Sequence, residues 1–350
     1  MPEKFEVKFM KRCLELAVKA EGLTYPNPLV GSVIVYNGKI IGEGYHLKAG
    51  GPHAEVNAIN SVHNKEMLSK STLYVNLEPC SHTGKTPPCT DLIISYKIPK
   101  VVIGAVDTSD KVSGKGIARL KNAGCEVIIG VLEAESRYLN RRFFTFHEKR
   151  RPYIFLKWAQ SADGYLDIIR SQVHNSGPTW ISGKPERILV HKWRSDEQSI
   201  LIGAETLRTD NPKLNVREWY GNNPLRLILS SSGTVGKELS LNGTNGAYIV
   251  FTHNTKADIG TATKVILKKN ETSAVQIADY LCNSGVQSVL IEGGAQVLNH
   301  FISTGLWDEA RIFYGNTRFI EGIKAPEISG KIYSKTTFIL SRLEIIYNEE

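Results

Sequence analysis

The chain has 350 residues, 41% of them hydrophobic and 22% charged, a composition that is typical of a folded α/β protein and excludes a disordered, collagen-like or disulfide-scaffold chain. Its length exceeds that of one ordinary domain and predicts two. The formal net charge of +8 suits phosphorylated small molecules and would also suit nucleic acid, although no arginine-rich tract or basic helix concentrates the charge.

No targeting or membrane segment is predicted. The first residues, MPEKFEVKFM, lack the apolar core of a signal peptide, and no apolar run approaches the length needed to cross a bilayer. The five cysteines are few and odd in number, which argues against a disulfide framework. We therefore expect a cytoplasmic protein with no membrane partner.

The first half of the chain alternates helix and strand signals. Apolar residues recur every four positions from Phe5 to Ala17, which predicts an amphipathic helix. Asn37-Gly38 is a favoured two-residue turn between two β-rich runs and predicts a hairpin. Strands are expected at 30–36, 39–45, 72–77, 101–106 and 126–130, and a helix at 116–122. The last two strands look buried, and the pattern predicts a mixed sheet with helices on both faces.

A charge-rich stretch at residues 133–151 precedes Pro152 and a new β-rich run at 153–158. We place a domain boundary near residue 147, which gives domains 1–147 and 148–350. Further strands are expected at 199–203, 225–230, 247–251, 264–267 and 288–291, and helices at 184–194, 273–284 and 295–303. The second half is therefore expected to be an α/β domain as well.

A zinc site is predicted in the first half. His53 begins a His-Ala-Glu sequence, and Cys80 and Cys89 each follow proline. One imidazole and two thiolates make a three-ligand zinc set whose fourth position is left for water. Zinc lowers the pKa of that water, so that hydroxide exists at neutral pH. Glu55 is close enough in sequence to move a proton from this water to a leaving amine, which is the pattern of zinc nucleobase deaminases.

Two other interpretations of these residues stay open. The two cysteines could be ordinary core residues, and His-Ala-Glu alone is a common sequence. A closed structural zinc site would need a fourth protein ligand, for which His82 is the candidate. We favour the deaminase interpretation because all the parts occur together and in order.

The spacing of the cysteines points to one family. Eight residues separate Cys80 from Cys89, whereas deaminases acting on free bases or nucleic acid typically have two. Residues 79–89, PCSHTGKTPPC, resemble the deaminase domain of the bifunctional riboflavin-biosynthesis deaminase/reductases. Matching segments are residues 22–31, 42–46 and 51–55. The resemblance covers about residues 5 to 145 and implies a cytidine-deaminase-like α/β/α sandwich.

The resemblance also implies substrate contacts in this half. Asn27 would bind the pyrimidine edge, with His46, Lys85 and Asp107 near the substrate. Independently, a carboxamide between two prolines is suited to a rigid pair of hydrogen bonds, although an Asx turn is the alternative. The family usually has Asp-Pro-Asn-Pro where this chain has Asp-Thr-Ser-Asp, so Ser109 replaces a substrate-contacting Asn. We expect substrate binding there to be rearranged.

The second half carries a different nucleotide signal. No Gly-x-Gly-x-x-Gly follows a strand, which argues against a standard Rossmann domain. Instead, residues 289–295, VLIEGGA, predict a strand that ends in two glycines before a helix. Exposed N–H groups at a helix N-terminus bind anions such as a cofactor phosphate. Paired glycines also occur in tight turns with no ligand.

Residues 157–164, 180–182, 201–212 and 214–217 resemble the reductase half of the same family, with coverage from about 152 to 314. The resemblance implies a dihydrofolate-reductase-like α/β domain that uses NADPH. It implies NADPH contacts at Ala159, Trp180, Thr206, Asp210, Ser231, Gly293 and Gly294. It implies contacts to the phosphoribosyl substrate at Arg194, Leu214, Arg217 and Glu292, and arginines grip phosphate in a bidentate manner. Pro178 stands where the family has Ser.

The sequence therefore predicts a bifunctional enzyme of riboflavin synthesis. The first half would deaminate 2,5-diamino-6-(5-phosphoribosylamino)pyrimidin-4-one with zinc, and the second would reduce the ribosyl group to ribityl with NADPH. We expect a homo-oligomer that acts on this small molecule and not on nucleic acid. One alternative is a tRNA adenosine deaminase with an accessory C-terminal domain. The other is a degenerate nucleotide-binding module without catalysis.

Overall fold

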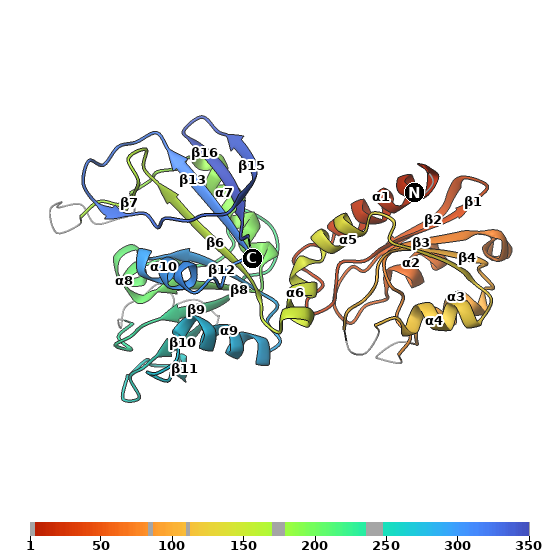
Figure 1. The fold of residues 1–350 in the computed structure, drawn as a ribbon, viewed down its shortest axis with the longest axis horizontal. Coiled ribbons are helices and arrows are strands. Elements are labelled where there is room, and N and C mark those ends of the chain that lie inside the picture. The colour runs from red at the N-terminus through yellow and green to blue at the C-terminus, as the bar shows by residue number, and fades with distance from the viewer. Residues whose placement is uncertain (1–3, 83–86, 110–112, 170–178, 236–247, 350) are drawn as a thin grey trace. The chain divides into compact units, whose positions relative to one another are not determined.

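The chain divides into two units, Met1–Arg150 and Arg151–Glu350, in the computed structural model (Figure 1). The structure describes residues 4–82, 87–109, 113–169, 179–235 and 248–349. Within these ranges, no helix combines the length and the apolar character needed to cross a membrane.

The predicted helix and hairpin at the start of the first unit are confirmed. Helix α1 spans Lys4–Val18 and buries Phe9 and Cys13. Strands β1 (Gly31–Tyr36) and β2 (Lys39–Tyr45) pair antiparallel. Asn37 and Gly38 between them have φ values of 49° and 72°. Positive φ at both turn residues is the backbone that an Asn-Gly hairpin turn requires.

The sheet of the first unit is mixed, as predicted. Its described strand order is β2-β1-β3-β4-β5. Strand β1 is antiparallel to β2 and β3, and β3, β4 and β5 are parallel. The remaining strands and helices are β3 (Thr72–Leu77), β4 (Lys100–Ala105), β5 (Glu126–Ile129), α2 (Ala54–Ser61), η1 (Lys65–Lys70, a 3₁₀ helix), α3 (Cys89–Ser95), α4 (Lys115–Asn122), α5 (Glu133–Leu139) and α6 (Arg141–Lys149).

Alternating residues of these strands feed a separate core on each face of the sheet. Ile34 and Leu73 pack with residues of α2, α3 and α4, whereas Val33, Tyr74 and Val102 pack with α1. Because side chains alternate along a strand, both faces of the central strands are buried. The helices lie on both faces in Figure 1, so the expected α/β/α sandwich is confirmed.

One expectation for this unit is corrected. Strand β5 was expected to be buried, but Glu126 and Ile129 are exposed. The reason is that β5 forms the edge of the described sheet and pairs only with β4. The charge-rich stretch before Pro152 forms α5 and α6, and α6 buries Phe143 and Phe144.

The second unit is built on one large sheet with the described strand order β11-β10-β9-β8-β12-β6-β13-β16-β15. In this order, all strands from β11 through β13 are parallel to their neighbours. Strand β16 is antiparallel to β13, and β15 is antiparallel to β16. The bounds are β6 (Tyr153–Gln160), β8 (Ser199–Gly203), β9 (Leu225–Leu229), β10 (Tyr248–Thr252), β11 (Thr263–Ile266), β12 (Ser288–Gly293), β13 (Glu309–Gly315), β15 (Lys331–Thr337) and β16 (Ser341–Tyr347).

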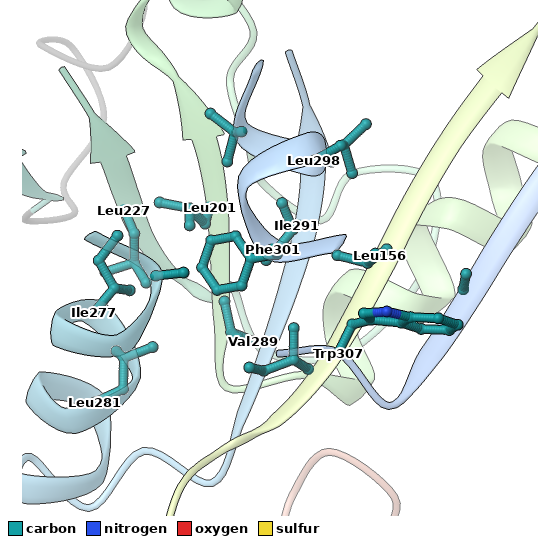
Figure 2. Close-up of a cluster of buried hydrophobic side chains, with 14 of the residues drawn as sticks. Leu156, Leu201, Leu227, Ile277, Leu281, Val289, Ile291, Leu298, Phe301 and Trp307 are labelled. Carbon is teal, nitrogen blue, oxygen red and sulfur yellow. The ribbon is translucent and has the colours of Figure 1, made fainter. Parts of the chain in front are cut away.

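Helices cover both faces of this sheet. Their bounds are α7 (Lys184–Asp196), α8 (Ala204–Asp210), α9 (Ser273–Asn283) and α10 (Ala295–Ser303), and a separate two-stranded pair joins β7 (Tyr165–Asp167) to β14 (Ile323–Lys324). Figure 2 shows the core under α9 and α10, where Phe301 packs among Leu201 and Ile291 of neighbouring strands. Trp193 of α7 packs with Phe155 and Phe313 on the opposite face.

The parallel arrangement brings three chain segments to one edge of this sheet. Strands β8, β12 and β6 are neighbours, and each ends at the same edge because they run in the same direction. The turn at Gly203, the turn at Gly293-Gly294 and the end of β6 therefore meet. Ligands of α/β proteins bind at such carboxyl ends.

Candidate functional site

The three predicted metal ligands meet in the first unit. His53 immediately precedes α2, Cys80 follows β3, and Cys89 is the first residue of α3. The His53 Nδ1 atom lies 3.5 Å from Cys80 Sγ and 3.3 Å from Cys89 Sγ. The donor atoms of all three lie within 4.8 Å of one another. A nitrogen and two sulfurs at this spacing are suited to bind one zinc ion.

Local hydrogen bonds favour a thiolate at this cluster. The Cys89 backbone N–H donates to Cys80 Sγ at 3.3 Å. A hydrogen bond from the Cys89 thiol lowers the pKa of Cys80, and His53 adds to this effect. His82, the candidate fourth ligand of a closed site, is exposed and is not part of the cluster that the described residues form. The donor set therefore fits the open zinc site of a catalyst better than a closed structural site.

Glu55 lies beside this cluster. It is the second residue of α2, is only 3% exposed, and hydrogen-bonds Cys89. Burial, with a smaller contribution from the charge of Cys80, raises the pKa of Glu55 to about 6. A carboxyl group with a pKa near neutrality can accept a proton and return it.

Asn27 and His46, both predicted to lie near the substrate, are hydrogen-bonded to each other. The Asn27 Nδ2 atom lies 3.0 Å from His46 Nε2, and His46 Nδ1 lies 3.0 Å from the Pro52 carbonyl oxygen. A carbonyl can only accept, so Nδ1 of His46 carries the proton and Nε2 accepts from Asn27. The ring of His46 packs edge-on against that of His53, with 5.5 Å between the centroids. These contacts place the Asn27 carboxamide near the metal cluster.

Asp107 follows β4 and is buried. Its Oδ1 accepts the Ser109 backbone N–H at 2.7 Å. Burial raises the pKa of Asp107, and hydrogen bonds from Ser109 oppose this. Ser109 therefore holds Asp107 in an Asx turn. Lys85, predicted to be near the substrate, lies outside the described residues.

In the second unit, the Gly293-Gly294 turn packs against Thr206. Gly294 has a φ of 78° and precedes α10. A Cβ added at Gly293 or Gly294 would lie 3.1 Å from a Thr206 side-chain atom. Only glycine leaves the space between this turn and Thr206 open, and we call this space the cradle. The first N–H groups of α10 lie at this turn. The cradle fits a phosphate of NADPH, the predicted cofactor.

Arg194 and Glu292, both predicted substrate contacts, form a buried ion pair. Two bonds of 2.6 and 2.7 Å join the Arg194 guanidinium to the Glu292 carboxylate. Burial alone would raise the pKa of Glu292, but Arg194 outweighs burial and the pKa is lowered. Lys157 has no predicted role from the sequence. Burial lowers its pKa, and it interacts electrostatically with both Arg194 and Glu292. Its signal in the sequence is an amine within an otherwise apolar strand.

The loop at residues 214–218 is held on α7. Leu214 is buried with a φ of 50°, so only its backbone can reach a substrate. Arg194 Nη1 donates to the Asn215 carbonyl oxygen at 3.3 Å, and the Arg217 backbone N–H donates to His191 Nδ1 at 3.3 Å. His191 was missed by the sequence analysis, because nothing local in the sequence links it to Arg217.

The other predicted cofactor contacts lie around the same sheet edge or on the surface near it. Ala159 is near the end of β6, Ser231 is exposed after β9, and Asp210 ends α8. Trp180 is 56% exposed, with the Arg187 guanidinium 4.6 Å above its ring. Pro178 lies outside the described residues. NADPH binding by these residues stays a prediction.

Comparison with family models assigns both halves of the chain. Residues 3–105 match the cytidine and deoxycytidylate deaminase zinc-binding region. Residues 152–318 match the RibD C-terminal domain. Riboflavin biosynthesis protein RibD of Aquifex aeolicus is 38% identical over 334 residues, which cover 94% of this chain and 92% of that protein. The chain belongs to the RibD family.

Other RibD proteins match over nearly their whole length. RibD of Bacillus amyloliquefaciens is 38% identical and covers 93% of this chain and 88% of its own length. A Thermotoga maritima structure described as a diaminohydroxyphosphoribosylaminopyrimidine deaminase/5-amino-6-(5-phosphoribosylamino)uracil reductase is 37% identical, with a TM-score of 0.90 over 98% of this chain and 99% of that one. Acinetobacter baumannii RibD is 30% identical, with a TM-score of 0.87 over 99% of both chains.

Membership of the RibD family confirms the predicted fold class and function. The chain is a bifunctional riboflavin biosynthesis enzyme with a zinc-binding deaminase domain and a reductase domain. The two predicted cofactors, zinc and NADPH, are those of the RibD family's two halves. A tRNA deaminase with an accessory domain is not supported, because the second half matches the RibD C-terminal domain. The roles of individual residues stay predictions.

Proposed function

We propose that the first unit deaminates 2,5-diamino-6-(5-phosphoribosylamino)pyrimidin-4-one and that the second unit reduces the ribosyl group of the product to ribityl. The observation that carries this proposal is the meeting of His53, Cys80 and Cys89 beside the buried carboxyl of Glu55. The substrate assignment is supported by the activity in the description of the Thermotoga maritima structure. The positive net charge suits a substrate and a cofactor that both carry phosphate.

In the deaminase, His53, Cys80 and Cys89 would hold zinc, which when bound lowers the pKa of a coordinated water. Glu55 takes a proton from the attacking water. It delivers that proton to the ring nitrogen next to the carbon under attack, and then transfers the remaining hydroxyl proton to the amine, so that ammonia leaves and a carbonyl remains. Its pKa of about 6 lets the same carboxyl group perform both transfers.

The pyrimidine is oriented by the chain's own hydrogen-bonding groups. Because His46 accepts from Asn27 Nδ2, the carboxamide of Asn27 is fixed with its oxygen left for an N–H of the pyrimidine. Asp107, held by Ser109, accepts a further hydrogen bond from the substrate, and Lys85 contributes positive charge.

In the reductase, NADPH would be held by the residues that the resemblance implies, and when bound it supplies a hydride. Thr206 and the Gly293-Gly294 turn form the phosphate cradle. The resemblance implies further NADPH contacts at Asp210, which ends α8, at Ser231 after β9, at Ala159 near the end of β6 and at Trp180. The nine-residue helix α10 directs its N-terminal N–H groups at the cradle.

The phosphoribosyl substrate would bind Arg217 and the Arg194–Glu292 pair, with the backbone of Leu214 completing the loop. Hydride transfer to C1′ of the opened ribosyl group requires an accompanying proton. Lys157 and Glu292 are buried groups on neighbouring strands that can move it. Most of the rate then comes from holding the two reactants together.

The location and assembly of the enzyme follow from its cysteines and its surface. The described residues include all five cysteines, none of which forms a disulfide, and the metal site needs reduced thiols, so we place the enzyme in the cytoplasm. The edge strand β15 exposes Ile332 and Tyr333, and the turn after it exposes Ile339 and Leu340. Exposed edges with apolar side chains favour association. We place the contact between two copies there, and light scattering on Ile339→Lys should show smaller particles.

A turnover experiment with two separate signals tests the proposal. Purified protein is mixed with zinc, NADPH and the diaminopyrimidinone phosphate, and ammonia release and NADPH absorbance are followed together. The proposal predicts that both signals change and that NADPH oxidation follows ammonia release. Activity on tRNA alone would favour the nucleic-acid deaminase, and binding of zinc and NADPH without turnover would favour a degenerate module.

A further inference from the structure

One buried carboxylate joins three segments around the metal cluster. Glu78 lies between the end of β3 and Cys80, and it is only 4% exposed. Its Oε2 accepts backbone N–H groups from Asp107 at 3.3 Å and Gly114 at 3.0 Å. Its Oε1 accepts those of Gly116 at 2.9 Å and Ile117 at 3.1 Å. One side chain thus receives four backbone hydrogen bonds from two other segments.

These bonds explain how a carboxylate can be buried there. An ionised carboxylate loses much hydration free energy on burial unless hydrogen bonds replace the water. Helix α4 begins at Lys115 after Gly114, and Gly114 offers no side-chain cap. The first N–H groups of a helix lack partners within the helix, and they carry its positive dipole end. Glu78 supplies the missing cap from the segment that follows β3.

The same helix is packed directly on the segment that carries Cys80. A Cβ added at Gly116 would lie 2.2 Å from the Pro79 carbonyl oxygen, so only glycine permits this approach. One turn farther along α4, Arg119 donates to the Ser81 carbonyl oxygen at 3.4 Å and pairs with Asp91 of α3 at 2.6 Å. Helix α4 therefore contacts the chain on both sides of Cys80.

We propose that Glu78 is a positioning residue of the deaminase, whose carboxylate fixes Cys80 and Asp107 relative to each other. Cys80 is two residues from Glu78 along the chain, and the backbone of Asp107 is hydrogen-bonded to it. The carboxylate therefore sets both metal affinity and substrate affinity. This inference rests on the proposed function, in which Cys80 binds zinc and Asp107 contacts the substrate.

The test is the variant Glu78→Gln. Glutamine keeps one oxygen but places an NH₂ group opposite two N–H donors, so two bonds are lost and donors face each other. We expect metal affinity, measured by competition with a chromogenic chelator, to fall roughly 10- to 100-fold, as for groups that orient metal ligands. The visible spectrum of the Co²⁺-loaded protein should change. The KM for deamination should rise, while reduction of the deaminated intermediate keeps its wild-type rate.

Three further variants separate positioning from stability. Glu126→Gln, a change of an exposed carboxylate in the same unit, should leave every readout at its wild-type value. Gly116→Ala should reproduce the weaker metal binding and altered Co²⁺ spectrum, because its methyl group displaces Pro79. If Glu78→Gln does not fold, Glu78→Asp is tested instead by metal affinity, Co²⁺ spectrum and KM. Aspartate keeps the charge but is too short to reach all four N–H groups, so the same changes are expected.

The proposal would be overturned by a variant that unfolds more easily yet keeps wild-type metal affinity, Co²⁺ spectrum and KM. Glu78 would then be only a helix cap. Failure of the proposed function gives a different result, because the wild-type protein would release no ammonia while the effect of Glu78→Gln on Co²⁺ binding stays measurable.

Discussion

The deaminase site depends on a carboxyl group that is buried but kept next to polar partners. Glu55 is the second residue of α2, and His53 immediately precedes the same helix. The Glu55 side chain is buried and hydrogen-bonds Cys89. Burial raises its pKa, so the group exchanges protons near neutral pH. A neutral amide of the same shape would keep the packing and lose the proton transfer.

Glu55→Gln should therefore retain zinc and lower the rate of ammonia release by roughly 10²- to 10⁴-fold, the usual contribution of a general acid–base group. Reduction of the deaminated intermediate should be unchanged. Metal analysis and the two turnover signals check this, with the exposed Glu66→Gln as control. Loss of zinc, or unaltered ammonia release, would remove Glu55 from the proposed role.

Arg194 is a stronger test of the reductase site than an exposed arginine would be, because it is paired with Glu292 where both side chains are largely buried, 11% and 7% exposed. Arg194→Ala leaves the Glu292 charge unpaired, which costs about 3–5 kcal/mol. The milder Arg194→Lys keeps the charge and loses the bidentate geometry. We expect it to raise the reductase KM at least about tenfold, with zinc content unchanged. The control is Arg342→Lys, a change of an exposed arginine. If Arg194→Lys and Arg342→Lys had the same reductase KM, Arg194 would not be a substrate contact.

The sequence identifies the metal ligands because each sits in a short motif with its own chemistry. His53 and Glu55 are two residues apart, and Cys80 and Cys89 are nine residues apart, each after a proline. Glu78, Lys157 and His191 could not be assigned in this way. Their partners lie 26 or more residues away, as in the bond between His191 and Arg217, so only the folded chain brings their contacts together.

At the scale of elements, the loop at residues 214–218 owes its position to α7. The backbone of Arg217 donates to His191, and Arg194 donates to the same loop. Burial first, and then the positive charges of Arg194 and Arg217, lower the pKa of His191 to about 4, against opposing contributions from Glu218 and Glu292. The neutral ring is therefore the form that holds the loop.

This gives a pH dependence with a definite sign. The unfolded chain binds the His191 proton near its ordinary pKa of 6.5, and the folded chain only near 4. Its contribution to stability is complete above pH 6.5 and is lost as the pH falls through that window. His191→Asn, whose oxygen can still accept from Arg217, should weaken this dependence. Urea unfolding followed by tryptophan fluorescence at several pH values tests it, and equal slopes for both proteins would contradict it.

Elements with local signals were predictable, and those without them were not. The Asn37-Gly38 hairpin follows from turn chemistry alone, and α10 from its apolar spacing and the glycines before it. The strands β13, β15 and β16 were missed. In β15 nearly every residue is exposed, so its sequence does not alternate between apolar and polar residues. Its pairing with β16 depends on the rest of the sheet.

At the scale of the whole molecule, the two chemistries belong to two units with separate cores. The second unit's core is centred on α9, α10 and the parallel strands, and Phe301 is fully buried within it. Damage to this core should therefore affect the reductase and spare the zinc site, because the metal ligands belong entirely to the first unit.

Phe301→Ala should destabilise the second unit by about 3–5 kcal/mol, the usual cost of truncating a buried phenylalanine. We expect NADPH oxidation to be lost at a lower temperature, with zinc content and ammonia release retained. Ile320→Ala, at a residue 86% exposed in the same unit, is the matched control and should have little effect. Equal loss of both activities on heating would show that the units do not unfold independently.

Zinc K-edge X-ray absorption on the purified enzyme is the most direct test of the account. It should show two sulfurs at about 2.3 Å, with one nitrogen and one oxygen at about 2.0–2.1 Å. Cys80→Ser should reduce the sulfur count by one. A zinc shell with no sulfur, a shell with four protein ligands, or a spectrum unchanged by Cys80→Ser would contradict the assignment of His53, Cys80 and Cys89 as the catalytic metal site.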